Sequence, residues 1–200
     1  MYGELPFSQA CENNKAPILA VLQQAFANCR QVLEVGSGTG QHAVHFAMHL
    51  TQLIWQASDQ RHYLPDLTER LRRAALANLP QPLALDVCHD GAPSTLYDGL
   101  FTANTLHIMP WPVVELLFSR LNEFTAPVAT LCIYGPFNYN GQFTSSSNQA
   151  FDASLKSRDA AMGIRDIEKV LLLAQRQDFV LQQDISMPAN NRLLWFSKQP

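Results

Sequence analysis

Val32-Leu33-Glu34-Val35-Gly36-Ser37-Gly38-Thr39-Gly40 decides the fold of this chain. An apolar strand carrying an acid near its end leads into three alternating glycines, and a helical pattern follows. Glycine has no Cβ, so such a loop brings its backbone close to a ligand. The spacing differs from the dinucleotide pattern Gly-x-Gly-x-x-Gly because Gln41 stands where the third glycine would be needed. Together with Glu34, this spacing favours S-adenosylmethionine over NAD as the ligand.

The composition of the 200 residues sets outer limits. A chain of this length suits one domain, and at 47% hydrophobic and 16% charged residues it can bury a sizeable core. The net charge of −3 gives no reason to expect nucleic acid as a partner. Apolar runs fall far short of the ~20 residues of a membrane span, and no signal peptide is evident. We expect a cytoplasmic monomer or homodimer with scattered free thiols, namely Cys11, Cys29, Cys88 and Cys132.

Strand and helix patterns alternate along most of the chain. Strands are predicted at residues 31–35, 53–57, 83–87, 99–104 and 128–134, and helices at 17–28, 41–50, 64–77 and 112–124, with Pro17 in a first turn. This alternation favours a doubly wound parallel sheet with helices on both faces. Residues 179–185 and 192–197 are two strands joined by a turn so short that they must be antiparallel. The predicted fold is a Rossmann-like, seven-stranded, mostly parallel sheet closed by an antiparallel hairpin, as in class I methyltransferases.

Polar residues follow the strands at the edge where ligands of such sheets bind. Asp59 follows the second strand and can accept hydrogen bonds from ribose hydroxyls. Asp86 can accept from an adenine amino group while the Val87 N–H donates to a ring nitrogen. Glu34 can help hold an ammonium group, and the main chain near Asn104 can meet the same end of the ligand. The residues expected to bind the cofactor are Glu34, Gly36, Ser37, Gly38, Gly40, His42, Asp59, Asp86, Val87 and Asn104.

Two further residues are candidates for the chemistry itself. His107 follows the fourth strand and could act as a general base or orient the substrate, since imidazole titrates near neutrality. Tyr134, at the end of the fifth strand, is the second candidate; either could instead be structural. His42, His45 and His49 share one side of a helix, but they border its apolar stripe. We therefore expect no metal, with His42 alone near the cofactor.

Two segments are expected to cover the site. Residues 137–147 are rich in Gly, Ser, Asn and aromatic residues and are predicted to form a long loop, a common form of binding segment. We expect one domain over residues 1–200, with residues 1–30 as a cap region and 135–165 as a substrate-covering loop and helix. The expected substrate contacts are Asn14, Phe137 and Asn148.

Several runs are more specific than the glycine loop. They are Asn104-x-x-His107-Ile108-x-Pro110-Trp111, Tyr134-Gly135-Pro136-Phe137, residues 145–155, Gly163-Ile164-Arg165-Asp166 and residues 10–19. With these runs the chain resembles, over nearly its whole length, an uncharacterised family of class I S-adenosylmethionine-dependent methyltransferases, methyltransferase-like proteins filed as a domain of unknown function. The chain departs from the family's pattern at Asn13, where a basic residue would be expected.

The resemblance implies methyl transfer from S-adenosylmethionine, with S-adenosylhomocysteine as the product. It names no acceptor. A small-molecule acceptor is favoured, because the expected covering segments offer aromatic and amide groups. A protein or RNA methyltransferase, a cofactor-binding protein without activity and an NAD-dependent oxidoreductase are the alternatives. Only the short cluster of Arg70, Arg72 and Arg73 hints at a polymer substrate.

Overall fold

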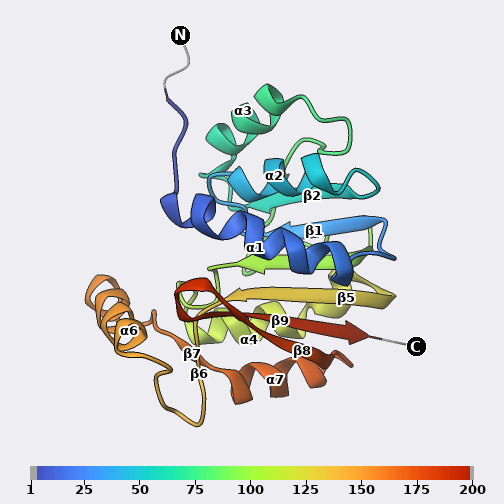
Figure 1. The fold of residues 1–200 in the computed structure, drawn as a ribbon. Coiled ribbons are helices and arrows are strands. Elements are labelled where there is room, and N and C mark those ends of the chain that lie inside the picture. Colours follow the sequence, from blue (N-terminus) through green and yellow to red (C-terminus); the bar gives the residue numbers. More distant parts are fainter. Residues whose placement is uncertain (1–3, 199–200) are drawn as a thin grey trace.

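Alternating strands and helices build a seven-stranded sheet with a small two-stranded sheet beside it (Figure 1). A computed structural model describes residues 4–198. The large sheet contains β1 (Gln31–Val35), β2 (Ile54–Asp59), β3 (Leu83–Ala84), β4 (Tyr97–Ala103), β5 (Thr125–Gly135), β8 (Val180–Met187) and β9 (Asn191–Lys198). The small sheet pairs β6 (Phe137–Asn138) with β7 (Arg165–Asp166). The helices are α1 (Gln9–Ala25), α2 (Gln41–His49), α3 (Leu64–Ala74), α4 (Trp111–Ser119), α5 (Leu121–Phe124), α6 (Ser146–Arg158) and α7 (Ile167–Gln175).

The strand order of the large sheet is β3-β2-β1-β4-β5-β9-β8. Strands β3, β2, β1, β4 and β5 pair in parallel, whereas β9 is antiparallel to both β5 and β8. The order reverses between β1 and β4, which is the kind of switch point where ligands bind. The predicted mostly parallel sheet with a terminal antiparallel pair is confirmed.

Side chains of the inner strands alternate between two hydrophobic clusters, one on each face of the sheet. Val32 packs with α1, α2 and α3, whereas Leu33 belongs to the cluster that contains α4, α5 and α7. Trp55, Phe46 and Phe101 are fully buried on the first face. Because burying one such side chain contributes about 1.5–3 kcal/mol, both layers hold β1 and β4 firmly. The ends of these strands are therefore fixed points for a site.

Helix α1 corrects one prediction. It begins at Gln9, where the Ser8 hydroxyl caps it by accepting from the Cys11 N–H. Pro17 therefore lies inside the helix and not in its first turn. The first turns of α1 were missed because their polar side chains contact other polar groups. Asn14, for example, is buried although it belongs to no apolar stripe.

Other boundaries also differ from the prediction. The third strand is only Leu83–Ala84, so Asp86 lies two residues beyond it. The predicted helix 112–124 is divided into α4 and α5 at Arg120. Residues 137–147 are not loop throughout, because β6 opens the segment and α6 begins at Ser146.

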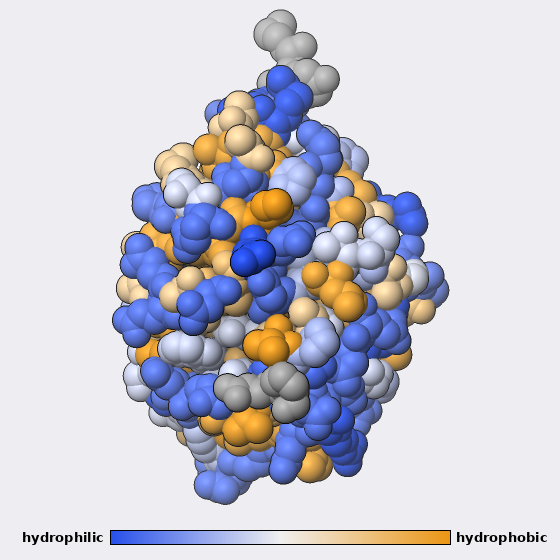
Figure 2. Space-filling view, turned by 90° about the vertical axis from the view of Figure 1, so that its right-hand side faces the viewer, coloured by the Kyte–Doolittle hydropathy of each residue, from blue (hydrophilic) through white to orange (hydrophobic). Residues whose placement is uncertain are grey.

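The two ends of the parallel strands differ in their surroundings. Their carboxyl ends point toward the side that carries α6 and the start of α1 (Figure 1). On the opposite side, seen in Figure 2, apolar side chains are scattered among polar ones. Among residues 4–198, no helix combines the length and the apolar character that crossing a membrane requires.

Candidate functional site

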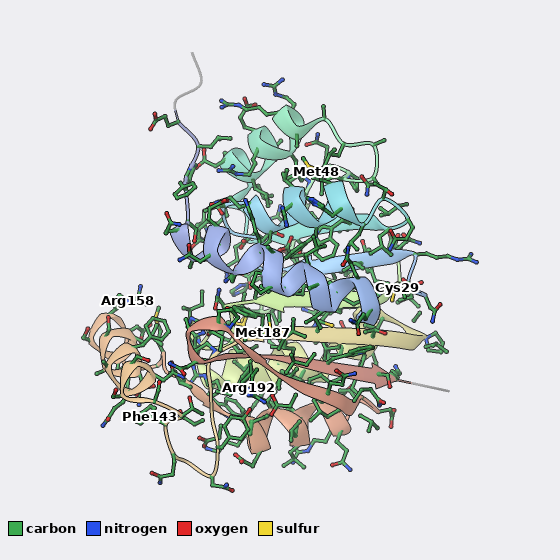
Figure 3. The ribbon with its side chains drawn as sticks, viewed as in Figure 1. Cys29, Met48, Phe143, Arg158, Met187 and Arg192 are labelled. Atoms are coloured by element: carbon green, nitrogen blue, oxygen red, sulfur yellow. The ribbon has the colours of Figure 1, made fainter. Side chains whose placement is uncertain are left out.

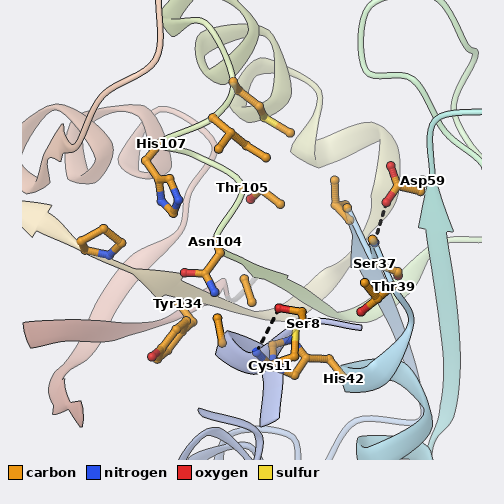
Figure 4. Close-up of a pocket in the computed structure, with 18 of the residues that line it drawn as sticks. Ser8, Cys11, Ser37, Thr39, His42, Asp59, Asn104, Thr105, His107 and Tyr134 are labelled. Carbon is orange, nitrogen blue, oxygen red and sulfur yellow. Dashed lines mark hydrogen bonds between the residues drawn. The ribbon is translucent and has the colours of Figure 1, made fainter. Parts of the chain in front are cut away.

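A cavity of about 970 Å³ opens at the carboxyl ends of the parallel strands. Its volume is at the upper end of the range of about 300–1,000 Å³ that ligand sites occupy. It brings together twelve of the predicted residues: Asn14, Gly36, Ser37, Gly38, His42, Asp59, Asp86, Val87, Asn104, His107, Tyr134 and Asn148. Figure 4 shows Asp59, Ser37 and Thr39 on one side of it, with Asn104, His107 and Tyr134 on the other.

The glycine loop forms one wall of this cavity. Its glycines have left-handed φ angles of 76°, 52° and 75° at Gly36, Gly38 and Gly40. The N–H groups of Gly36 and Ser37 donate to the Ser58 carbonyl at 3.1 and 3.0 Å. The Gly38 N–H donates to the Asp59 carboxylate at 2.6 Å. These three donors are thus used within the protein, so the loop offers close backbone approach more than free donors. A Cβ at Gly38 would meet nothing within 4 Å, so the wall is open there.

Glu34 lies beneath the loop and does not line the cavity. Its carboxylate accepts from the Ser37 hydroxyl at 2.9 Å and from the Trp55 indole N–H at 3.0 Å. Burial raises the pKa of Glu34 to about 7, although these two hydrogen bonds oppose the shift. Glu34 was expected to help hold a ligand; since it does not line the cavity, its contacts support the loop that does.

Gly40 is likewise outside the cavity, at the N-cap of α2. A Cβ at this position would lie 2.6 Å from Leu67 Cδ1, so Gly40 allows α2 and α3 to pack closely. Gln41, the residue that breaks the dinucleotide spacing, is buried and accepts from the Ser8 N–H at 2.6 Å. Its amide also donates to the Glu12 carboxylate at 2.6 Å. Gln41 thereby fastens the start of α1 beside the glycine loop.

One carboxylate, Asp59, ends β2, and a second, Asp86, lies beyond β3. Asp59 accepts from the Gln60 N–H at 2.7 Å in addition to Gly38, and burial raises its pKa. Asp86 accepts from the Cys88 N–H at 2.8 Å and lies 3.1 Å from the His89 ring. The hydrogen bond from the Cys88 N–H is the main cause that lowers the pKa of Asp86, and the contact with His89 is the second. Val87 lines the cavity beside it.

The segment after β4 forms the opposite wall. Asn104 has a left-handed φ of 57°, and its N–H donates to the Tyr134 carbonyl at 2.9 Å. His107 is buried, and its ring meets the edge of the Phe151 ring at 5.3 Å between centroids. Burial is the main cause that lowers the pKa of His107 to about 4, and the positive charge of Arg165 is the second. His107 is therefore a neutral imidazole at physiological pH.

A buried polar group connects α1, α2 and β5 at the floor of the cavity. The His42 ring is 2.6 Å from the Asn14 amide oxygen, and burial lowers its pKa to about 4. Burial raises the pKa of Tyr134, while interactions with Asn14 and Asn191 oppose the shift. Between residues 4 and 198, no group of three or more His, Cys, Asp or Glu side chains is arranged to hold a metal ion.

A family model described as "Protein of unknown function (DUF938)" matches residues 5–198. The chain belongs to the DUF938 family. The resemblance inferred from the sequence runs is confirmed at this level.

Solved structures of methyltransferases share the fold of this DUF938 chain. The apo form of the S-adenosylmethionine-dependent methyltransferase SibL superimposes with a TM-score of 0.79 at 18% identity, over 96% of this chain and 56% of SibL. An O-methyltransferase family 2 protein from Planctomyces limnophilus, in complex with apigenin, gives 0.79 at 16% identity, over 94% and 57%. NcsB1, an O-methyltransferase solved with S-adenosylmethionine and a naphthoic acid, gives 0.77 at 12% identity, over 96% and 55%. The DUF938 chain spans little more than half the length of these proteins, and the likeness is one of fold.

Of the two predicted substrate contacts in the segment after β5, one lines the cavity of this DUF938 protein and the other does not. Asn148, on α6, lines the cavity and donates to the Thr144 hydroxyl at 2.9 Å and the Asn190 carbonyl at 3.1 Å. Phe137 lies outside the cavity. It is 1% exposed and packs in the cluster with α4 and α7, so the prediction that it contacts a substrate is corrected. Its aromatic character in a Gly- and Asn-rich segment was misleading.

Sequence reasoning missed several residues that line the cavity. Ser8 and Cys11 come from the start of α1, and Thr105 follows β4. Phe151 comes from α6, and Met162 comes from the segment after it. The helix-capping potential of Ser8 was a usable signal. Cys11 and Phe151 stand in the runs 10–19 and 145–155 without an assigned role, and no pattern marked Thr105 and Met162.

Proposed function

We propose that this DUF938 protein transfers a methyl group from S-adenosylmethionine to a small-molecule acceptor. One observation carries the proposal. Gly38 and Asp59, joined by a hydrogen bond, form a wall of the same cavity whose other wall carries His107 and Tyr134. A nucleoside ligand and a second small molecule can therefore meet inside it. The family's shared fold with methyltransferases supports the reaction class.

The residues of the first wall fit S-adenosylmethionine. The open space at Gly38 admits a ligand against the backbone, and a Cβ would fill it. Each oxygen of Asp59 accepts one bond within the protein. Because a carboxylate oxygen can accept more than one hydrogen bond, Asp59 can still bind the ribose hydroxyls. Asp86 and Val87 would face the adenine. When bound, S-adenosylmethionine supplies a methyl group already activated on a sulfonium.

The second wall would orient the acceptor. His107 stays neutral, so one ring nitrogen can accept the proton that a hydroxyl or amine acceptor releases. Tyr134 stays protonated, since its pKa is raised, and is therefore suited to donate a hydrogen bond. Bringing the acceptor into line with the methyl group accelerates the transfer, because positioning replaces a collision in solution.

Calorimetry with S-adenosylhomocysteine and, separately, with NAD tests this proposal. We expect binding of the first and none of the second. NAD binding without S-adenosylhomocysteine binding would overturn it in favour of an oxidoreductase. Methyl-labelled S-adenosylmethionine incubated with metabolite extracts, peptides and RNA then identifies the acceptor class. Label confined to a polymer would contradict the small-molecule acceptor.

A further inference from the structure

We propose that the acceptor half of the cavity binds an uncharged, largely apolar ring compound and discriminates against anions. The acceptor half is defined here as the part lined by Ile108, Phe151, Met162, Asn148 and Tyr134. The inference rests on the proposed function, because it concerns the second molecule of that reaction. It is more specific than the reaction class, since it assigns the charge and polarity of the acceptor.

The first observation is an apolar surface that remains open to solvent. Ile108, in the segment after β4, is 43% exposed, and Phe151, on α6, is 39% exposed. Both line the cavity together with Met162. Removing apolar surface from water contributes about 25 cal/mol per Å², so a ligand with an apolar face gains affinity here. The adaptable thioether of Met162 suits a flat ring.

The second observation is that the polar groups of the acceptor half are neutral. Asn148 uses its side-chain N–H groups for Thr144 and Asn190, which leaves its carbonyl oxygen to accept from a ligand. Tyr134, and the ring of His107 in the cavity wall beside this half, are neutral as well. Such groups can recognise a hydroxyl or amine on the ring. They cannot neutralise a charge.

The third observation concerns cations. The residues found lining the cavity within the described range 4–198 include neither Lys nor Arg. Arg165 donates to the backbone carbonyls of Leu106 and Ala161 at 3.0 and 2.9 Å.

Other cations near this end of the sheet are also engaged. Lys156 pairs with Asp152 at 2.6 Å, and Arg192 pairs with Asp184 at 2.7 Å. Arg158, at the end of α6 (Figure 3), does not line the cavity, although its charge contributes to lowering the pKa of His107. A carboxylate placed in the acceptor half would lose its hydration without gaining a cation among the lining residues to hydrogen-bond with, which is costly.

Carboxylates of the protein strengthen this discrimination. Asp59 and Asp86 both line the cavity, in the half assigned to the cofactor. The negative charge of these two carboxylates repels an anionic acceptor. Asp152, a carboxylate on α6, is buried; it pairs with Lys156 and accepts from the Ile164 N–H. It offers no free charge for a cationic acceptor, so a neutral molecule fits best.

Two fluorescent probes that differ only in one charge test the inference. N-phenylnaphthylamine is neutral, and anilinonaphthalene sulfonate carries the same rings with a sulfonate. Titrations use the whole protein, with and without S-adenosylhomocysteine. We expect the neutral probe to bind at least about tenfold more tightly, a difference well within the cost of burying an unpaired anion. Equal or tighter binding of the sulfonate, or no binding of the neutral probe, would overturn the inference.

Variants place the probe in the acceptor half. Phe151→Ser should weaken the neutral probe several-fold, and Ile108→Lys should raise the affinity for the sulfonate by supplying the missing cation. Val128→Ser is the matched control, since Val128 is an exposed apolar residue outside the cavity. Equal effects of Phe151→Ser and Val128→Ser would contradict the location.

The inference and the proposed function can fail separately. Loss of probe selectivity with normal S-adenosylhomocysteine binding overturns only the acceptor class. Absent S-adenosylhomocysteine binding with selectivity retained overturns the reaction and leaves a neutral-ligand site.

Discussion

The backbone N–H of Gly38 donates to the Asp59 carboxylate at 2.6 Å, and this bond fastens the glycine loop to the end of β2. The contact joins the residue that allows close approach to the residue expected to bind ribose. Burial raises the pKa of Asp59 while the Gly38 and Gln60 N–H groups oppose the shift. Losing the carboxylate therefore affects both the loop and the ligand.

Replacing Asp59 tests its role in binding. Asp59→Asn keeps the shape but removes the charge, and bonds to charged groups contribute about 1.5–3 kcal/mol. We expect S-adenosylhomocysteine affinity to fall by about tenfold to a hundredfold. Calorimetry measures the loss. Asp66→Asn, an exposed acid on α3 outside the cavity, is the control. Wild-type affinity in Asp59→Asn would show that the ribose assignment is wrong.

Alanine at two glycines separates stability from binding. Gly36→Ala places a Cβ 2.5 Å from Thr105 Cγ2 at a φ of 76°, so strain and overpacking together should cost about 2 kcal/mol or more. Gly38→Ala adds strain of about 1–2 kcal/mol but meets no protein atom within 4 Å. We expect Gly36→Ala to have the lower Tm and Gly38→Ala the weaker S-adenosylhomocysteine binding relative to its stability. The reverse ranking of Tm values would contradict the packing argument.

The buried His42 should make the folded state less stable as the pH is lowered. Its pKa is lowered from 6.5 to about 4 in the folded protein, so the unfolded chain takes up its proton first. This contribution is present above pH 6.5 and is lost as the pH falls toward 4. Between about pH 7.5 and about pH 5, His42 should cost the folded state about 2 kcal/mol.

Urea unfolding of wild type and His42→Gln at both pH values measures this contribution. Glu34 has a raised pKa and therefore adds stability to the folded state as the pH falls. It is present in both proteins, so its contribution cancels in the difference. We expect the variant to lose less stability on acidification by about 2 kcal/mol. Identical pH dependence of the two proteins would refute the assignment.

Arg165 should control the titration of His107. Its charge adds to burial in lowering the pKa of His107, and Arg158 contributes less. In Arg165→Gln the pKa of His107 should rise but stay below 6.5, because burial is the larger cause. Arg158→Gln should raise it by a smaller amount. Titration by NMR measures both, and an unchanged pKa in Arg165→Gln would contradict the coupling.

The parts of the fold that follow a simple period could be predicted. Strand β1 and helix α2 lie within a residue of their predicted bounds because both carry continuous apolar patterns. The antiparallel pair followed from the length of one turn. A helix was expected within residues 135–165, but the bounds of α6 were not predicted, because its apolar face is short and its buried Asn148 makes polar contacts with Thr144 and Asn190.

The candidate site shows the same division. Strand ends bring Asp59, Asn104 and Tyr134 into one cavity because parallel strands end at one edge of a sheet. Phe137 was misplaced since an aromatic residue in a polar segment fits either a binding loop or a core. Phe151 stood in the run 145–155 with no role assigned, and Met162 could not be found, because their place in the cavity depends on how α6 packs and not on any spacing.

Strand β9 also sets the order in which the molecule can be assembled. It lies between β5 and β8, and within the described sheet β8 pairs with β9 alone. Until the ribosome has passed residue 198, β5 must leave one edge without its partner. Such an edge invites pairing with other chains. Synthesis of this protein therefore includes an interval in which aggregation through this open edge is a hazard.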